Sequence, residues 1–184
     1  MNVKGIAFIA RKEQIISGFG EERWNDFIQR FEESHPVFEQ GILATTLIPV
    51  EEFIAFQNEV IKEFYNGDFK MTWKLGEKSA ENALSENGPF HVFLKRKREP
   101  EDFLSNVLPR IWNMYYDEGR SKNVFEGNIM HAYILDLPKY YAYFEYVVMG
   151  FTQKFLELIE VPIKEITKIK SSAKEIHYKF VLDL

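Results

Sequence analysis

The sequence contains no cysteine among its 184 residues. This absence excludes disulfide bonds, thiolate nucleophiles, zinc ribbons and cysteine-ligated iron–sulfur clusters. Histidine is also scarce, and no H-x-H, H-x-x-x-H or HExxH motif is formed by the four histidines, His35, His91, His131 and His177. We therefore predict no metal and no cofactor from local motifs, while a metal site built from distant parts of the chain stays open.

Excess basic charge and long uncharged apolar runs are missing as well. The net charge is −5, whereas nucleic-acid binding needs a basic face, so we expect no nucleic-acid partner. The longest apolar stretch, residues 140–159, contains Glu145, Lys154 and Glu157. Each charge at mid-bilayer depth costs about 2.5–3.5 kcal/mol, which favours a buried helix over a membrane span. The N-terminus has only a short apolar patch and no cleavage site, so we expect no signal peptide and a cytoplasmic location.

Motifs of catalysis are equally absent, because the sequence has no G-x-S-x-G, P-loop or G-x-G-x-x-G pattern. Adjacent glutamates at 21–22, 32–33 and 51–52 lie at expected helix starts or exposed faces, with nothing that pairs them for acid–base chemistry. We therefore expect a protein that is not an enzyme. The basic run 95–98 is followed by acidic residues, which offset its field within a Debye length. A solvated surface is expected there, and docking to an acidic partner is the alternative.

Aromatic residues, in contrast, are abundant at 16%, and the spacing of apolar residues predicts an α+β fold. Helical periodicity covers residues 20–34, 49–67 and 69–87, and a longer helix starts near residue 99. Two strands within 121–138, a helix over 139–159 and two alternating segments after it complete the chain. This order predicts a β-β-α-β-β antiparallel sheet unit. We expect a single domain, 1–184, with a mainly helical subdomain, 1–98, and a helix-plus-sheet subdomain, 99–184.

Several short motifs resemble those of a known superfamily. They are "GFGEERWNDFIQRF" (18–31), "GDFKMTWKLGEKSAENAL" (67–84) and "LPRIWNMYYDEG" (108–119). These stretches resemble the heme nitric oxide-binding (H-NOX) domains and their relatives, which include bacterial 4-vinyl-reductase-type sensors and Golgi transport subunits. The resemblance implies a helical N-terminal part followed by a helix and an antiparallel sheet that enclose a ligand. It also implies a bacterial ligand-binding or sensory protein involved in signalling.

The heme-binding residues of that superfamily do not carry over. Where the resemblance places the iron-ligating histidine, this chain has Trp112, whose indole nitrogen has no lone pair to offer. The porphyrin-binding pattern Tyr-x-Ser-x-Arg keeps Tyr133, but Leu135 and Leu137 stand in place of serine and arginine. The resemblance therefore implies a heme-less relative. A heme sensor that uses a displaced histidine, His131 or His91, is the alternative.

Two groups of residues are candidates for an apolar ligand pocket. Leu108, Trp112 and Tyr115 come from the helix after residue 99, and His131 and Tyr133 point to one side of a predicted strand. A few polar groups in an apolar cavity are typical of a small-molecule site, so we predict that an apolar small molecule binds between the helical half and the sheet. The other interpretation is core packing for the aromatic residues and a half-exposed strand position for His131.

The predicted helix 139–159 supports a function of another class. Five of the seven residues at 140–146 are aromatic, and so many cannot share one face of a helix. Interfaces are enriched in such side chains, so an assembly module that forms a homodimer through this helix is the second hypothesis. Exposed tyrosines on a monomer are the alternative.

Overall fold

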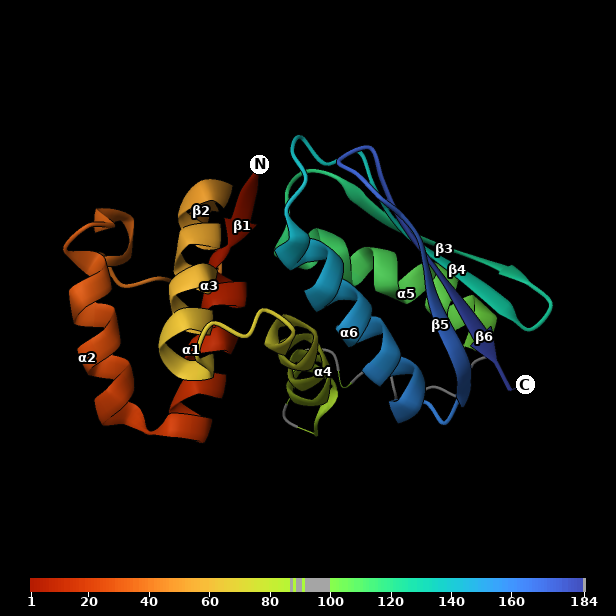
Figure 1. The fold of residues 1–184 in the computed structure, drawn as a ribbon, viewed down its shortest axis with the longest axis horizontal. Coiled ribbons are helices and arrows are strands. Elements are labelled where there is room, and N and C mark those ends of the chain that lie inside the picture. The colour runs from red at the N-terminus through yellow and green to blue at the C-terminus, as the bar shows by residue number, and fades with distance from the viewer. Residues whose placement is uncertain (87, 89–90, 92–99, 184) are drawn as a thin grey trace. The chain divides into compact units, whose positions relative to one another are not determined.

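A computed structural model describes residues 1–86, 88, 91 and 100–183 (Figure 1). The chain divides into two compact units: Met1–Met71 with Tyr115–Asp117, and Thr72–Met114 with Glu118–Leu184. This boundary differs from the predicted division at residue 98, because the helix that follows residue 70 belongs to the second unit. The single domain stays a prediction, and the basic run 95–98 lies outside the described residues.

The first unit consists mainly of helices. Its elements are β1 (Asn2–Lys4), α1 (Gly5–Phe19), α2 (Glu21–Glu32), the 3-10 helix η1 (Pro36–Phe38), β2 (Leu47–Pro49) and α3 (Val50–Tyr65). The helices predicted over 20–34 and 49–67 are confirmed as α2 and α3. Neither α1 nor the antiparallel pairing of β1 with β2 was predicted from the sequence.

An aromatic core holds α1, α2 and α3 together. Trp24, Phe27 and Phe31 follow one another at helical spacing on α2, and all three side chains are buried. Phe56 of α3 lies within 6.2 Å of each of these rings, measured between ring centres. Such aromatic pairs add to the free energy that the buried area already provides. The spacing that predicted α2 therefore also identifies the core of this unit.

The second unit contains a four-stranded antiparallel sheet. Its elements are α4 (Met71–Leu84), α5 (Pro100–Tyr115), β3 (Arg120–Glu126), β4 (Ile129–Leu135), α6 (Ala142–Leu158), β5 (Ile163–Ser171) and β6 (Glu175–Leu182). The strands lie in the order β3-β4-β6-β5 and every neighbouring pair is antiparallel. The predicted α+β class and the β-β-α-β-β order are both confirmed.

The two faces of this sheet differ in what covers them. Figure 1 shows α5 and α6 on the same side. Asn123 of β3 donates a hydrogen bond to the Leu104 carbonyl of α5, and Tyr178 of β6 donates one to Glu145 of α6. Residues that alternate with these along the strands lie on the opposite side. We call the side covered by α5 and α6 the inner face and the other side the outer face.

Two glycines allow α4 and α6 to approach closely. A Cβ atom added at Gly76 of α4 would lie 2.1 Å from the Val147 carbonyl oxygen of α6. Likewise, a Cβ atom added at Gly150 of α6 would lie 2.2 Å from the Trp73 carbonyl oxygen of α4. Only glycine fits where two backbones come this close. These contacts fix α4 against the helix that covers the inner face.

The aromatic residues at the start of α6 find partners within the second unit. Tyr143 and Phe144 are buried, and the half-buried Tyr146 lies edge-on to Trp73 of α4 at 6.4 Å between ring centres. The Tyr140 hydroxyl donates to Glu145. Contacts within the chain therefore account for these side chains, and the homodimer stays a prediction. No helix in the described part of the chain is long and apolar enough to cross a bilayer.

Candidate functional site

Trp112 lies on the inner side of the sheet unit, on α5. Its side chain is 3% exposed, and its indole N–H donates to the Glu118 carbonyl oxygen at 3.2 Å. The Phe144 ring of α6 lies edge-on to it at 6.3 Å between ring centres. Gly119 has a positive φ of 71°, and a Cβ atom there would lie 3.2 Å from Cζ2 of Trp112. The tryptophan therefore fills a closely packed position and uses its one polar atom to hold the turn after α5.

The other helix candidates fall into two groups. Leu108 is buried one turn before Trp112 on α5 and belongs to the same unit. Tyr115 is half-buried and belongs to the first unit, where its ring centre lies 6.0 Å from that of Tyr116. Leu108 and Trp112 are thus the helix candidates that share one core. A pocket formed by the predicted residues stays a prediction.

His131 and Tyr133 lie on the outer face of the sheet. The buried residues of β4 are Met130, Ala132 and Ile134, and His131 and Tyr133 alternate with them. The structure therefore places these two side chains on the side of the sheet away from Trp112. The expectation that they share one side of a strand is confirmed.

His177, for which the sequence predicts no role, completes this outer-face group. Tyr133 is paired with His177 in the register of β4 and β6, and their rings stack with centres 4.3 Å apart. Nδ1 of His131 lies 2.8 Å from Nε2 of His177. Alternation along both strands was visible in the sequence, but the register that brings the two imidazoles together was not. No group of three or more histidine, aspartate or glutamate side chains among the described residues could hold a metal ion.

A buried carboxylate forms a second polar group, on the inner face. Glu145 of α6 is 0% exposed and accepts hydrogen bonds from Tyr140 and Tyr178 at 2.6 Å each, and Lys168 Nζ lies 2.7 Å from it. Burial alone would raise the pKa of Glu145, but the bonds from Lys168 and the two tyrosines outweigh it and hold that pKa below the usual value. Burial and the bond to Glu145 raise the pKa of Tyr178. The carboxylate is therefore an anion that ties α6 to β5 and β6.

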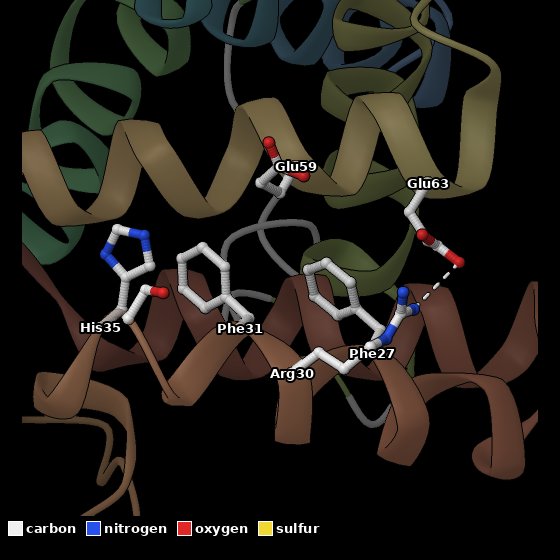
Figure 2. A pocket seen from close by; sticks show the side chains of 7 residues that line it. Phe27, Arg30, Phe31, His35, Glu59 and Glu63 are labelled. Carbon is white, nitrogen blue, oxygen red and sulfur yellow. Dashed lines mark ion pairs between the residues drawn. The ribbon is translucent and has the colours of Figure 1, made fainter.

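The first unit contains an open pocket of about 280 Å³ between α2 and α3. Figure 2 shows Phe27 and Phe31 pointing from α2 towards Glu59 and Glu63 of α3, with Arg30 in an ion pair with Glu63 at 3.3 Å. Its lining residues are Phe27, Arg30, Phe31, Ser34, His35, Glu59 and Glu63. Both phenylalanines are buried. The ion pair between Arg30 and Glu63 neutralises two of the charges that line the pocket. The pocket does not involve the residues predicted from the sequence.

No protein-family model and no curated protein matches the sequence. Solved structures do match the fold. An H-NOX protein from S. oneidensis in the Fe(II) state, a triple mutant, superposes with a TM-score of 0.75 at 11% identity over 98% of this chain and 96% of that one. Its Fe(II)NO form gives 0.73 at 13% identity over 98% and 99%, and the H-NOX protein from K. algicida gives 0.70 at 15% over 98% and 97%. The chain has the H-NOX fold.

Whether this chain could ligate a heme iron depends on the side chain at position 112 and on where the histidines lie. An axial ligand needs a lone pair, and the indole nitrogen of Trp112 carries a hydrogen that it donates to Glu118. None of the four histidines lies on α5, because they occupy the position directly before η1 (His35), a 3-10 position after α4 (His91), β4 (His131) and β6 (His177). Trp112 and its surroundings therefore do not fit an iron-ligating position.

Proposed function

We propose that this chain is a non-enzymatic small-molecule-binding or sensory protein that uses the H-NOX fold without a histidine-ligated heme. The observation that carries the proposal is Trp112, which occupies the position where the resemblance places the iron ligand. Its ring is buried and its N–H is engaged with Glu118. The solved structures of similar fold include Fe(II), Fe(II)NO and Fe(II)CO states. In those proteins, iron takes part in binding the small ligand, whereas Trp112 cannot ligate iron.

An apolar molecule is the ligand class that we propose. Leu108 and Trp112 offer hydrocarbon surface, and Trp112 has already used its polar atom. Binding would follow from removal of apolar surface from water, at about 25 cal/mol per Å². The side chains of Leu108 and Trp112 on α5 would form one wall of the site. His131 and Tyr133 lie on the outer face of the sheet and Tyr115 belongs to the first unit, so these three residues are not part of this wall. A bacterial, cytoplasmic role in signalling belongs to the same proposal.

Native mass spectrometry of the full chain purified from cells tests the ligand. We expect a bound species of low mass. We also expect that it competes with the fluorescent probe 1-anilinonaphthalene-8-sulfonate, whose aromatic rings bind apolar surface. Trp112→Phe keeps an apolar ring and serves as the matched control for Trp112→Ala, which is expected to change probe affinity more. A chain that purifies without any small molecule and binds no probe would contradict the proposal.

Hemin titration tests the heme-less part separately. We expect no stoichiometric complex with a Soret band of a histidine-ligated heme. A one-to-one hemin complex whose band disappears in His131→Ala or His91→Ala would instead support the displaced-histidine alternative. Because the ligand test and the hemin test use different probes, either part of the proposal can fail without the other.

A further inference from the structure

Two imidazole rings meet on the outer face of the sheet. His131 of β4 and His177 of β6 are diagonal neighbours, and their facing nitrogens, Nδ1 and Nε2, are 2.8 Å apart. Their side chains are 18% and 13% exposed, so each ring is largely packed but open to solvent on one side. Tyr133 stacks on His177 at 4.3 Å with 21° between the ring planes, which fixes the orientation of that imidazole. The pair is thus held in place before any ligand arrives.

Each ring has a carboxylate near its other nitrogen. Glu126 Oε2 lies 3.9 Å from Nε2 of His131, and Glu175 Oε1 lies 3.9 Å from Nδ1 of His177. The second oxygen of Glu175 is held by Lys170 at 2.9 Å, which keeps that carboxylate in place. The carboxylates are too far away for a direct hydrogen bond, but their negative charge favours a hydrogen on the outer nitrogen of each ring. When both rings carry their hydrogen there, both inner nitrogens have a free lone pair to offer a metal ion.

In the free pair, the 2.8 Å separation is that of a hydrogen bond, in which one ring donates its inner N–H to the lone pair of the other. A metal ion can take the place of this hydrogen and accept both lone pairs when the donor ring carries its hydrogen on the outer nitrogen instead. We propose that His131 and His177 form a binding site for a divalent transition-metal ion of the kind that imidazole prefers, Cu²⁺ or Zn²⁺, with Glu126 and Glu175 as positioning residues and water as the remaining ligands. Nothing in the proposed ligand-binding role depends on this site, because the pair lies on the face of the sheet away from Trp112.

Metal binding would require only a small movement of the two imidazole rings. Zinc–nitrogen bonds of about 2.0–2.1 Å at tetrahedral angles would separate the two nitrogens by roughly 3.3 Å, about half an ångström more than in the free pair. Small side-chain rotations can increase the distance between the two nitrogens by this amount, because α5 and α6 do not cover the outer face.

Three lysines and two glutamates surround the pair. Lys179 is paired with His131 across β4 and β6, Lys122 with Tyr133 across β3 and β4, and Lys170 with His177 across β5 and β6. Glu126 and Glu175 offset these cations in part, and Lys170 is already in an ion pair. Thr167, opposite Lys179, adds no charge. The sequence has no cysteine to compete for a soft metal, so imidazole nitrogens are the strongest metal ligands that this chain offers.

Calorimetric titration of the full chain with CuCl₂ and with ZnCl₂ at pH 7.5 tests the site. We expect one strong site per chain, with Cu²⁺ bound more tightly than Zn²⁺. The electron paramagnetic resonance spectrum of the Cu²⁺ complex is expected to show hyperfine splitting from two nitrogen ligands. Glu126→Gln and Glu175→Gln are each expected to weaken binding roughly tenfold.

The variants His131→Gln and His177→Gln each remove one ligand while keeping a polar side chain of similar size. Each is expected to abolish the strong site and reduce the nitrogen signal to one or none. His35→Gln is the matched control, because His35 is bonded to Glu52 in the other unit and should bind metal like the wild type. Circular dichroism and thermal unfolding confirm that each variant is folded. Wild-type binding that is no tighter than that of the double variant His131→Gln/His177→Gln would overturn the proposal.

Discussion

Two polar groups on opposite faces of the four-stranded sheet differ in their exposure to solvent. On the inner face, Glu145 is 0% exposed and interacts with Lys168, Tyr140 and Tyr178. On the outer face, His131 and His177 are 18% and 13% exposed and interact mainly with each other. A desolvated anion held by several hydrogen bonds resists change, whereas imidazoles beside water can gain or lose a proton or a metal ion.

The difference shows how one sheet separates stability from binding. Removing a partner from the inner group leaves a buried polar atom unsatisfied, which is costly in a low-dielectric interior. Removing a partner from the outer group exposes its neighbours to water, which can replace the lost hydrogen bond. We therefore expect substitutions on the inner face to alter unfolding and substitutions on the outer face to alter binding.

The largest expected effect is that of Glu145→Ala. The substitution leaves the buried Tyr178 hydroxyl without its acceptor and creates a cavity next to β6. We expect the free energy of unfolding to fall by about 2–4 kcal/mol, the sum of an unsatisfied hydroxyl and a small cavity. Lys168 is 43% exposed on its side chain and can turn to water, so it adds little to the loss. Urea denaturation measures the change.

Glu145→Gln is the matched control for that variant, because the amide keeps the volume and one acceptor oxygen. It should lose less stability than Glu145→Ala. Copper binding by the outer histidines should be the same in both variants once they are folded. A Glu145→Ala protein as stable as the wild type would show that the inner group does not hold α6 to the sheet.

The next effect is expected from Gly150→Ala. The new methyl group would lie 2.2 Å from the Trp73 carbonyl oxygen, so α4 and α6 must move apart. Overpacking of this kind costs about 1–3 kcal/mol, although alanine favours the helix itself. Gly18→Ala is the control, since nothing lies within 4 Å of a Cβ atom at that position of α1. Thermal unfolding should show a lower midpoint for Gly150→Ala and no loss for Gly18→Ala.

How far the sequence predicts these features depends on the range of the interactions involved. Helical spacing on α2 and α3 and alternation on β4 and β6 are local patterns, and the structure confirms them. The pairing of β1 with β2 involves three-residue strands far apart in the chain, which leave no periodic signal. His131 meets His177 only through a register set by the whole sheet. The charge of Glu145 ruled out a membrane span, but its partners Lys168 and Tyr178 come from strands that fold back later in the chain.

A smaller effect is expected from Trp112→Phe. The change removes the indole N–H and leaves the Glu118 carbonyl oxygen to find water. We expect a loss of about 1 kcal/mol in the free energy of unfolding, the usual net value of one hydrogen bond. Urea denaturation measures it, and Trp24→Phe in the aromatic core of the first unit provides a comparison by the same substitution. A loss as large as that of Glu145→Ala would mean that the α5 turn, and not the Glu145 group, dominates the stability of the inner side.

The smallest expected effect is a difference between the two faces in how the free energy of unfolding depends on pH. The pKa of His177 is lowered in the folded chain, first by burial and then by His131, from an unfolded value near 6.5. A lowered pKa means that the unfolded chain binds the proton more readily, so the stabilising contribution is complete above pH 6.5 and is lost as the pH falls through the folded pKa. The pKa of Glu145 is lowered as well, but from 4.5, so its contribution is lost only in more acidic solution.

Unfolding measured at steps from pH 7.5 to 3 should therefore show two separate losses. The loss just below neutral pH should be smaller in His177→Gln than in the wild type, and the loss below pH 4.5 should be smaller in Glu145→Gln. Each variant should leave the other loss unchanged, because the two groups lie on opposite faces of the sheet. If His177→Gln instead altered the acidic loss, the imidazole pair and the buried carboxylate would be coupled through the sheet, and the two faces would not act independently.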